Sequence, residues 1–286
     1  MFQNHVAVFP ERTVRLDQLN VIPNKESAGR LAEMQSASSG VTEETFGEHV
    51  LIVFPCHIDW RILSHGDHSS HLELIRALST EADTKLLDVA RYQLCRLKSI
   101  DELPGRAGQL HSNKMMSGAL LYNGGLHESR IIGGQAFTHW ISSAFPMNLF
   151  DLDASNFPRN GEAGNVVKQA LALYTAMLES NTETTRFVQA LSLLEFLTYP
   201  TEYKKFVEVK EVVAKYARNR QEKRKISERL YELTGKKDDS GVTTGYRTRI
   251  VHMGQKIEQI VPNVAERKQL FNELDGYLRI CMKMAT

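Results

Sequence analysis

The sequence has little cysteine, and its uninterrupted apolar runs are short. Its three cysteines, Cys56, Cys95 and Cys281, are scattered and odd in number, which argues against a disulfide framework and fits a reducing compartment. The longest apolar run, Val50–Phe54, falls far short of the roughly 20 residues that a membrane-spanning helix needs. The first residues lack a basic region followed by an apolar one, so we expect no signal peptide. We therefore expect a cytoplasmic protein without membrane attachment.

An excess of charge of either sign is also lacking, because the net charge is only +1. No long-range field draws the whole chain onto nucleic acid, so any basic surface must be local. Residues 204–256 predict such a surface, since fifteen lysines and arginines stand there against seven acidic residues. One predicted helix carries many of these cations, a pattern suited to phosphate backbones: Lys215, Arg218, Arg220, Lys223, Arg224, Lys225 and Arg229. The alternative is a solvated helix whose cations pair with Glu211, Glu222 and Glu228.

The organisation of the 286 residues indicates two domains. Hydrophobic residues make up 42% and charged residues 24%, as in ordinary globular proteins. Residues 151–165 are rich in turn-forming residues and resemble a linker. We expect an α+β protein, with a mixed α/β domain in residues 1–155 and an all-α helical bundle in residues 165–286. The first domain completes no nucleophile or metal motif, so we assign it a sensing or specificity role.

The N-terminal half predicts strands, then helices, then turns. His5–Pro10 and Val50–Pro55 are apolar runs that proline closes, which is typical of short strands. Residues 26–34 predict a short helix. Apolar residues recur at three- and four-residue spacing between Leu72 and Leu97, which predicts two helices. The glycine pairs within residues 104–135 match no nucleotide-binding pattern and favour turns or a hairpin.

The C-terminal half is helical in its period throughout. Apolar positions predict five helices: residues 166–178, 187–197, 206–233, 251–261 and 267–282. Pro262 ends the fourth of these. Antiparallel helices joined by short loops form a bundle.

The segment Tyr246–Gly254, with sequence YRTRIVHMG, carries the most specific chemical signal. Arginine offers a fixed fork of donors suited to phosphate and keeps its charge at physiological pH. Histidine gives and takes protons near neutrality. Arg247 and His252 frame four residues, so the segment supplies one group to hold a phosphoryl charge and one to move protons.

Residues 247–254 resemble the Arg-polar-x-x-x-His signature of HEPN domains, in the version found in ApeA-like HEPN proteins. Thr248 replaces the usual small polar residue, and Met253 is inserted before Gly254. The resemblance covers residues 165–285. It implies a metal-independent endoribonuclease without a cofactor, acting as a homodimer with a composite site, in bacterial anti-phage defence or as a toxin. It also implies an acidic residue that supports the Arg–His pair, and Glu195 on the second bundle helix has that place.

The resemblance and the basic surface together give two sets of candidate site residues. The candidate catalytic residues are Arg247, Thr248, His252 and Glu195. Two places are open to Glu195: a contact with Arg247 or Arg249, or simple exposure on the surface of its helix. The candidate RNA-binding residues are Tyr246, Arg249, Arg218, Arg220, Lys223 and Arg224. RNA and a second copy of the chain are the expected partners, and an antitoxin or sensor protein is a further one.

Two other functions stay open on the sequence. A HEPN bundle without catalysis would bind RNA or a protein partner. A metal-dependent hydrolase would use the histidine cluster His57–His71, which also holds Asp59 and Asp67. The metallo-hydrolase pattern His-x-His-x-Asp-His would need histidine at position 63, where Leu63 stands, so no metal site is predicted.

Overall fold

The computed structural model describes residues 3–5, 15–16, 19–22, 51–98, 107–108, 117–123, 126, 128–134 and 157–285. The chain separates into two compact units. The first comprises Met1–Gln93 and Asp101–Ala154, and the second comprises Leu94–Ile100 and Ser155–Thr286. The second unit thus includes a short segment from the first half of the chain, which the sequence did not predict. A mostly helical chain with an antiparallel sheet is of the α+β class.

The first unit contains a six-stranded sheet in the order β2-β3-β4-β1-β5-β6, and every neighbouring pair is antiparallel. Its strands are β1 (Gln3–His5), β2 (Arg15–Leu16), β3 (Leu19–Ile22), β4 (Leu51–Pro55), β5 (Ser117–Asn123) and β6 (Glu128–Gly134). The predicted strand is confirmed over Leu51–Pro55 as β4, while Val50 lies outside the described residues. Within the glycine-rich segment, β5 and β6 pair as a hairpin. The predicted strand His5–Pro10 shares only His5 with β1. Residues 6–10 and the predicted helix 26–34 lie outside the described residues.

Helices of the first unit follow β4 without a long break. They are α3 (Ile62–His65), α4 (His68–Ala82), the π-helical turn η1 (Asp83–Leu87) and α5 (Asp88–Leu94). The two predicted helices are therefore joined directly by a π turn. The buried guanidinium of Arg91 lies 3.2 Å from carboxylates of both Asp83 and Asp88, so an ion triad stabilises this turn.

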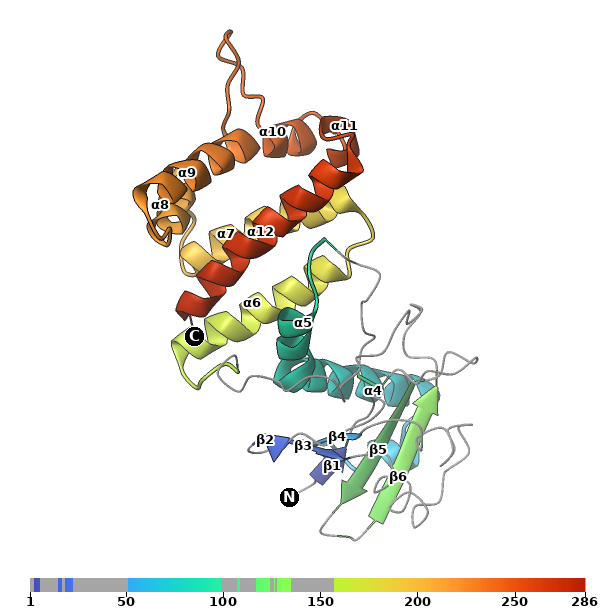
Figure 1. The fold of residues 1–286 in the computed structure, drawn as a ribbon. Coiled ribbons are helices and arrows are strands. Elements are labelled where there is room, and N and C mark those ends of the chain that lie inside the picture. Colours follow the sequence, from blue (N-terminus) through green and yellow to red (C-terminus); the bar gives the residue numbers. More distant parts are fainter. Residues whose placement is uncertain are drawn as a thin grey trace. The chain divides into compact units, whose positions relative to one another are not determined.

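The second unit is a bundle of helices (Figure 1). Its helices are α6 (Glu162–Leu178), α7 (Glu183–Thr198), α8 (Phe206–Lys215), α9 (Arg220–Thr234), α10 (Tyr246–Val251), α11 (Ile257–Ile260) and α12 (Val264–Ala285). Helix α12 packs against α6 and α7, and α8 packs against α9. The core between them includes fully buried Phe187, Leu191, Leu230 and Phe271. Among the described residues, no helix is long and apolar enough to cross a membrane.

Two of the predicted bundle helices are wrong in their extent. The predicted helix 206–233 is broken after Lys215, because the side chain of Asn219 accepts a hydrogen bond from Glu222 N (2.9 Å) and starts a new helix. The predicted helix 251–261 does not exist as one element. Helix α10 ends at Val251, and α11 starts only at Ile257. Gly254 adopts a φ of +67° between them, a conformation that does not continue a helix.

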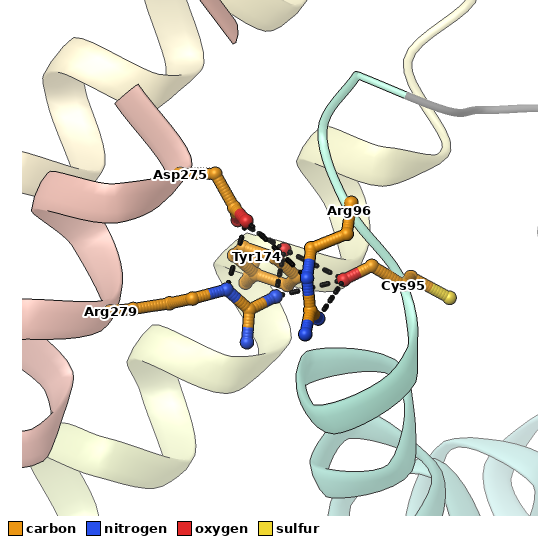
Figure 2. Close-up of polar contacts among 5 residues, drawn as sticks. All are labelled: Cys95, Arg96, Tyr174, Asp275 and Arg279. Atoms are coloured by element: carbon orange, nitrogen blue, oxygen red, sulfur yellow. Dashed lines mark hydrogen bonds and ion pairs between the residues drawn. The ribbon is translucent and has the colours of Figure 1, made fainter. Parts of the chain in front are cut away.

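Polar contacts within the second unit fix residues 94–98 to the bundle (Figure 2). The main-chain carbonyl of Cys95 accepts hydrogen bonds from Arg279 Nη2 (2.8 Å) and Arg96 Nη1 (2.9 Å). Asp275 accepts from the Tyr174 hydroxyl (2.7 Å) and from Arg279 Nε (2.8 Å). Burial, together with the nearby Asp275 carboxylate, raises the pKa of Tyr174. The phenol therefore stays a neutral donor in this network.

Candidate functional site

Helix α10 is placed by a close approach of the chain to the end of α9. A Cβ at the buried Gly245 would lie 2.7 Å from the carbonyl carbon of Thr234, so only glycine allows this approach. The intervening residues form a narrow, exposed tongue closed by a bridge between Lys237 and Thr243 (Figure 1). The carboxylate of Asp238 accepts hydrogen bonds across the tip of the tongue.

Tyr246 fixes the start of α10 against its neighbours. Its ring lies 6.4 Å from the ring of Phe187 in α7 and 6.0 Å from the guanidinium of Arg229 in α9. Its hydroxyl lies 3.5 Å from Glu232. The side chain that we expected to contact RNA is thus engaged in packing within the bundle.

Arg247 forms a two-pronged ion pair with Glu195. Its Nη1 lies 2.6 Å from Oε1 and its Nη2 lies 3.3 Å from Oε2 of the carboxylate, which confirms the expected contact for Arg247. The ring of Phe206, the first residue of α8, lies 5.9 Å from the guanidinium. The two side chains remain 32% and 20% exposed. Because the carboxylate uses one N–H on each terminal nitrogen, Nε–H and two further N–H groups can bind a phosphate.

His252 lies at the opposite end of α10 and is exposed. Its backbone N–H donates to the carbonyl of Thr248 (2.9 Å), which makes His252 the C-terminal cap of the helix. Val251, Met253 and Gly254 beside it are exposed as well. The imidazole therefore stands on a projecting turn that a substrate can reach.

Arg249 and Gln255 close the base of this turn. Arg249 Nε donates to Gln255 Oε1 (2.7 Å), and Gln255 N donates to the carbonyl of Arg249 (3.1 Å). The expected alternative, a contact of Arg249 with Glu195, is therefore not the one observed. Arg249 instead holds the two ends of the turn that carries His252.

Within one chain, the two key groups of the motif point to different places. The guanidinium of Arg247 is directed towards α7 and α8, and the imidazole of His252 is in solvent at the far end of α10. On a continuous helix, two residues five positions apart would lie about 140° apart around the axis. The end of α10 at Val251 replaces that geometry, yet the separation of the two groups remains.

The basic residues around α9 divide into paired and unpaired cations. Arg224 pairs with Glu228 at 2.7 Å, as in a solvated helix with internal ion pairs. In the part of the chain that the structure describes, the exposed side chains of Arg218, Arg220 and Lys223 have no carboxylate within ion-pair distance. These three cations are available to a polyanion.

Residues of the histidine cluster in the first unit form local contacts around the start of α4. Asp67 caps this helix, because its carboxylate accepts from Ser70 N at 2.8 Å. A ring nitrogen of His71 lies 3.1 Å from the carbonyl of Ile62. Asp59 pairs with its neighbour Arg61 at 2.8 Å. Among the described residues, no group of three or more His, Cys, Asp or Glu side chains is placed to hold a metal ion.

Three residues that matter to this site were not singled out in the sequence. Gly245 could have been found, since glycine directly before a helix signals a special start. Phe206 and Gln255 carry no such signal, because their roles depend on tertiary contacts with Arg247 and Arg249.

The comparisons with known proteins give no relative. No family model, no curated protein and no solved structure matches the chain.

Proposed function

We propose that this protein is a metal-independent endoribonuclease of the HEPN type that acts in bacterial anti-phage defence or as a toxin. The observation that carries the proposal is the Arg247–Glu195 ion pair, which joins residues 52 positions apart and orients a guanidinium at the start of the short helix that ends at the exposed His252. A positioned arginine and an accessible imidazole are the two groups that cleavage of a phosphodiester needs.

The mechanism follows from the chemistry of these two groups. The 2′-hydroxyl beside the scissile phosphate attacks the phosphorus, which restricts the reaction to RNA. His252 transfers a proton, either from the attacking 2′-oxygen or to the departing 5′-oxygen. Arg247 holds the non-bridging oxygens as their charge increases in the transition state, and Glu195 fixes its orientation. The products are a 2′,3′-cyclic phosphate and a 5′-hydroxyl.

The composite site of a homodimer is part of the proposal. In one chain the guanidinium and the imidazole lie at opposite ends of α10, so one copy does not aim both at a single phosphate. Two copies related by a dyad bring the arginine of one to the histidine of the other. The unpaired cations Arg218, Arg220 and Lys223 then extend the surface along the RNA backbone.

A mixing experiment tests the shared site. Arg247→Ala and His252→Ala proteins, each inactive alone, are unfolded together, refolded and assayed for RNA cleavage. Half of the dimers are then mixed, and each mixed dimer keeps one site with both groups, so about one quarter of wild-type activity returns. Both variants inactive and no recovery on mixing would place the two groups in one chain. Full activity of either variant alone contradicts the proposal.

A second candidate is a bundle that binds RNA without cutting it. The exposed, unpaired cations near α9 favour this function, since binding needs only phosphate contacts. RNA retention that weakens steeply with salt, with intact RNA recovered after long incubation, would identify it.

A further inference from the structure

A pocket of about 280 Å³ opens into the bundle at the ends of four helices. Its walls come from the start of α6, the end of α7, the end of α8 and the end of α12. The lining residues are Ala163, Val166, Leu197, Thr198, Pro200, Val212, Tyr216 and Cys281. All of them belong to the second unit.

The chemistry of the lining selects for a neutral guest. No lining side chain is ionic, so a charged ligand would lose its hydration without gaining a counter-charge. Burial raises the pKa of Cys281 to about 12, so its thiol is neutral. The Thr198 hydroxyl is occupied by the carbonyls of Leu194 (2.8 Å) and Glu195 (3.1 Å). Tyr216 also lines the pocket and carries a hydroxyl, a neutral group that can bind a polar atom of a ligand.

The volume sets the size of the guest. An apolar cavity of about 150 Å³ in another protein is known to hold benzene. A pocket of about 280 Å³ therefore has room for two fused rings. It is smaller than most pockets for drug-sized molecules, which begin near 300 Å³.

Two helices that line the pocket, α7 and α8, also carry the residues that contact Arg247. On α7, Leu197 and Thr198 lie two and three residues after Glu195, and the hydroxyl of Thr198 donates to the carbonyl of that same residue. On α8, Val212 belongs to the helix whose first residue, Phe206, lies beside the guanidinium. A ligand in the pocket would thus contact α7, which carries Glu195, and α8, whose Phe206 lies beside the Arg247 guanidinium.

We propose that this pocket binds a small, neutral, largely apolar molecule with the size of indole, and that binding changes the environment of the Arg247–Glu195 pair. The binding site stands independently of any RNA cleavage. Its role as a regulator of cleavage rests on the proposed function.

Indole is a suitable probe, because it is neutral, has two fused rings and carries one N–H donor. Titration of the full-length protein, followed by NMR of methyl groups, should show saturable 1:1 binding. The shifts should concentrate on the methyl groups of Ala163, Val166, Leu197 and Val212. The Arg247 Nε–H signal should shift with the same dissociation constant, while the Arg224 Nε–H signal stays still. Shifts that do not saturate, or that gather on exposed apolar residues such as Leu173, overturn the site.

Blocking the pocket provides the matched test. Ala163 is exposed at the rim, so Ala163→Trp can fold while its ring fills the mouth. Losing about 60 Å² of apolar contact weakens binding about tenfold. Ala172→Trp, at an exposed position of α6 outside the pocket, should bind indole as the wild type does. Equal affinity of the Ala163→Trp and wild-type proteins overturns the assignment. Saturable binding without a shift at Arg247 overturns the coupling, whether or not the protein cleaves RNA.

Discussion

Two segments of this chain concentrate histidine with charged residues, and the structure uses them differently. In His57–His71, the polar groups form local contacts: Asp67 caps α4, and His71 contacts the carbonyl of Ile62. In Tyr246–Gly254, Arg247 instead reaches Glu195 on another helix, and His252 remains exposed. Local structure therefore explains the first segment. The second segment joins residues that are far apart in sequence and leaves an imidazole accessible.

The largest expected difference between the two segments is in RNA cleavage. In the proposed mechanism, His252→Ala removes the proton-transfer group, and such a loss typically lowers the rate about 10² to 10⁴-fold. Arg247→Ala removes the proposed donor to the developing charge, which should lower the rate about 10² to 10³-fold. Arg247→Lys should also fail, because a point charge does not replace the fork. His65→Ala and His68→Ala should leave the rate of RNA cleavage, measured on a labelled RNA, largely intact. If either control lowered the cleavage rate more than about a hundredfold without unfolding, the histidine-rich segment would take part in the reaction.

Two glycines flank α10, and their replacement by alanine should lower the free energy of unfolding by different amounts. Gly245→Ala drives a Cβ into the backbone of Thr234 and should lower the free energy of unfolding by about 1–3 kcal/mol. Gly254 has open space where a Cβ would lie, but its φ is +67°. Gly254→Ala should therefore lower the free energy of unfolding by about 1 kcal/mol. Denaturant unfolding measures both. A Gly245→Ala protein as stable as wild type would mean that α10 does not depend on this approach.

The ion pairs of Glu195 and Glu228 offer a matched pair of carboxylates. Glu195→Gln keeps the shape of the side chain but weakens its hold on Arg247, so cleavage should fall about tenfold through lost orientation. Glu228→Gln loosens an exposed pair with Arg224 and should change neither cleavage nor stability measurably. Single-turnover rates on a saturating RNA check the first effect. Equal cleavage rates for the two variants would mean that Glu195 does not contribute to cleavage.

The smallest expected effect concerns the cap in the histidine-rich segment. The backbone N–H of Ser70 donates to Asp67 and is the larger cause that lowers the pKa of this carboxyl below its ordinary value. The Ser70 hydroxyl also donates and lowers this pKa further. A depressed carboxyl pKa contributes stability above the unfolded value of about 4, and this contribution is lost as the pH falls through the folded value. Asp67→Asn keeps a cap without titrating, whereas Asp67→Ala removes the cap.

Thermal unfolding across pH 2 to 7 reads out this effect. The stability difference between wild type and Asp67→Asn should shrink towards acid pH, and Asp67→Ala should be the least stable at neutral pH. A wild-type advantage that grows on acidification would contradict the assignment of the cap.

How much the sequence could predict depended on the range of the interactions. The strand Leu51–Pro55 and the apolar faces of α6, α7 and α12 follow from local periodicity, and the structure confirms them. The break at Asn219 and the end of α10 were missed, because a continuous apolar period hid a capping side chain and a left-handed glycine. The contact of Glu195 with Arg247 was expected only through the family resemblance. The contacts of Arg247 with Phe206 and of Arg249 with Gln255 depend on how helices and turns pack, which the sequence pattern does not encode.

The chemical ends of the RNA products distinguish metal-independent attack by the 2′-hydroxyl from metal-dependent hydrolysis by water. Purified protein is incubated with a 5′-labelled RNA in excess EDTA, beside a matched RNA that lacks the 2′-hydroxyl at the cut site. We expect cleavage of the first RNA to a 2′,3′-cyclic phosphate and a 5′-hydroxyl, no cleavage of the second RNA at that position, and no product with His252→Ala. Products with a 3′-hydroxyl and a 5′-phosphate, loss of activity in EDTA, or wild-type rates for His252→Ala would contradict the proposed mechanism.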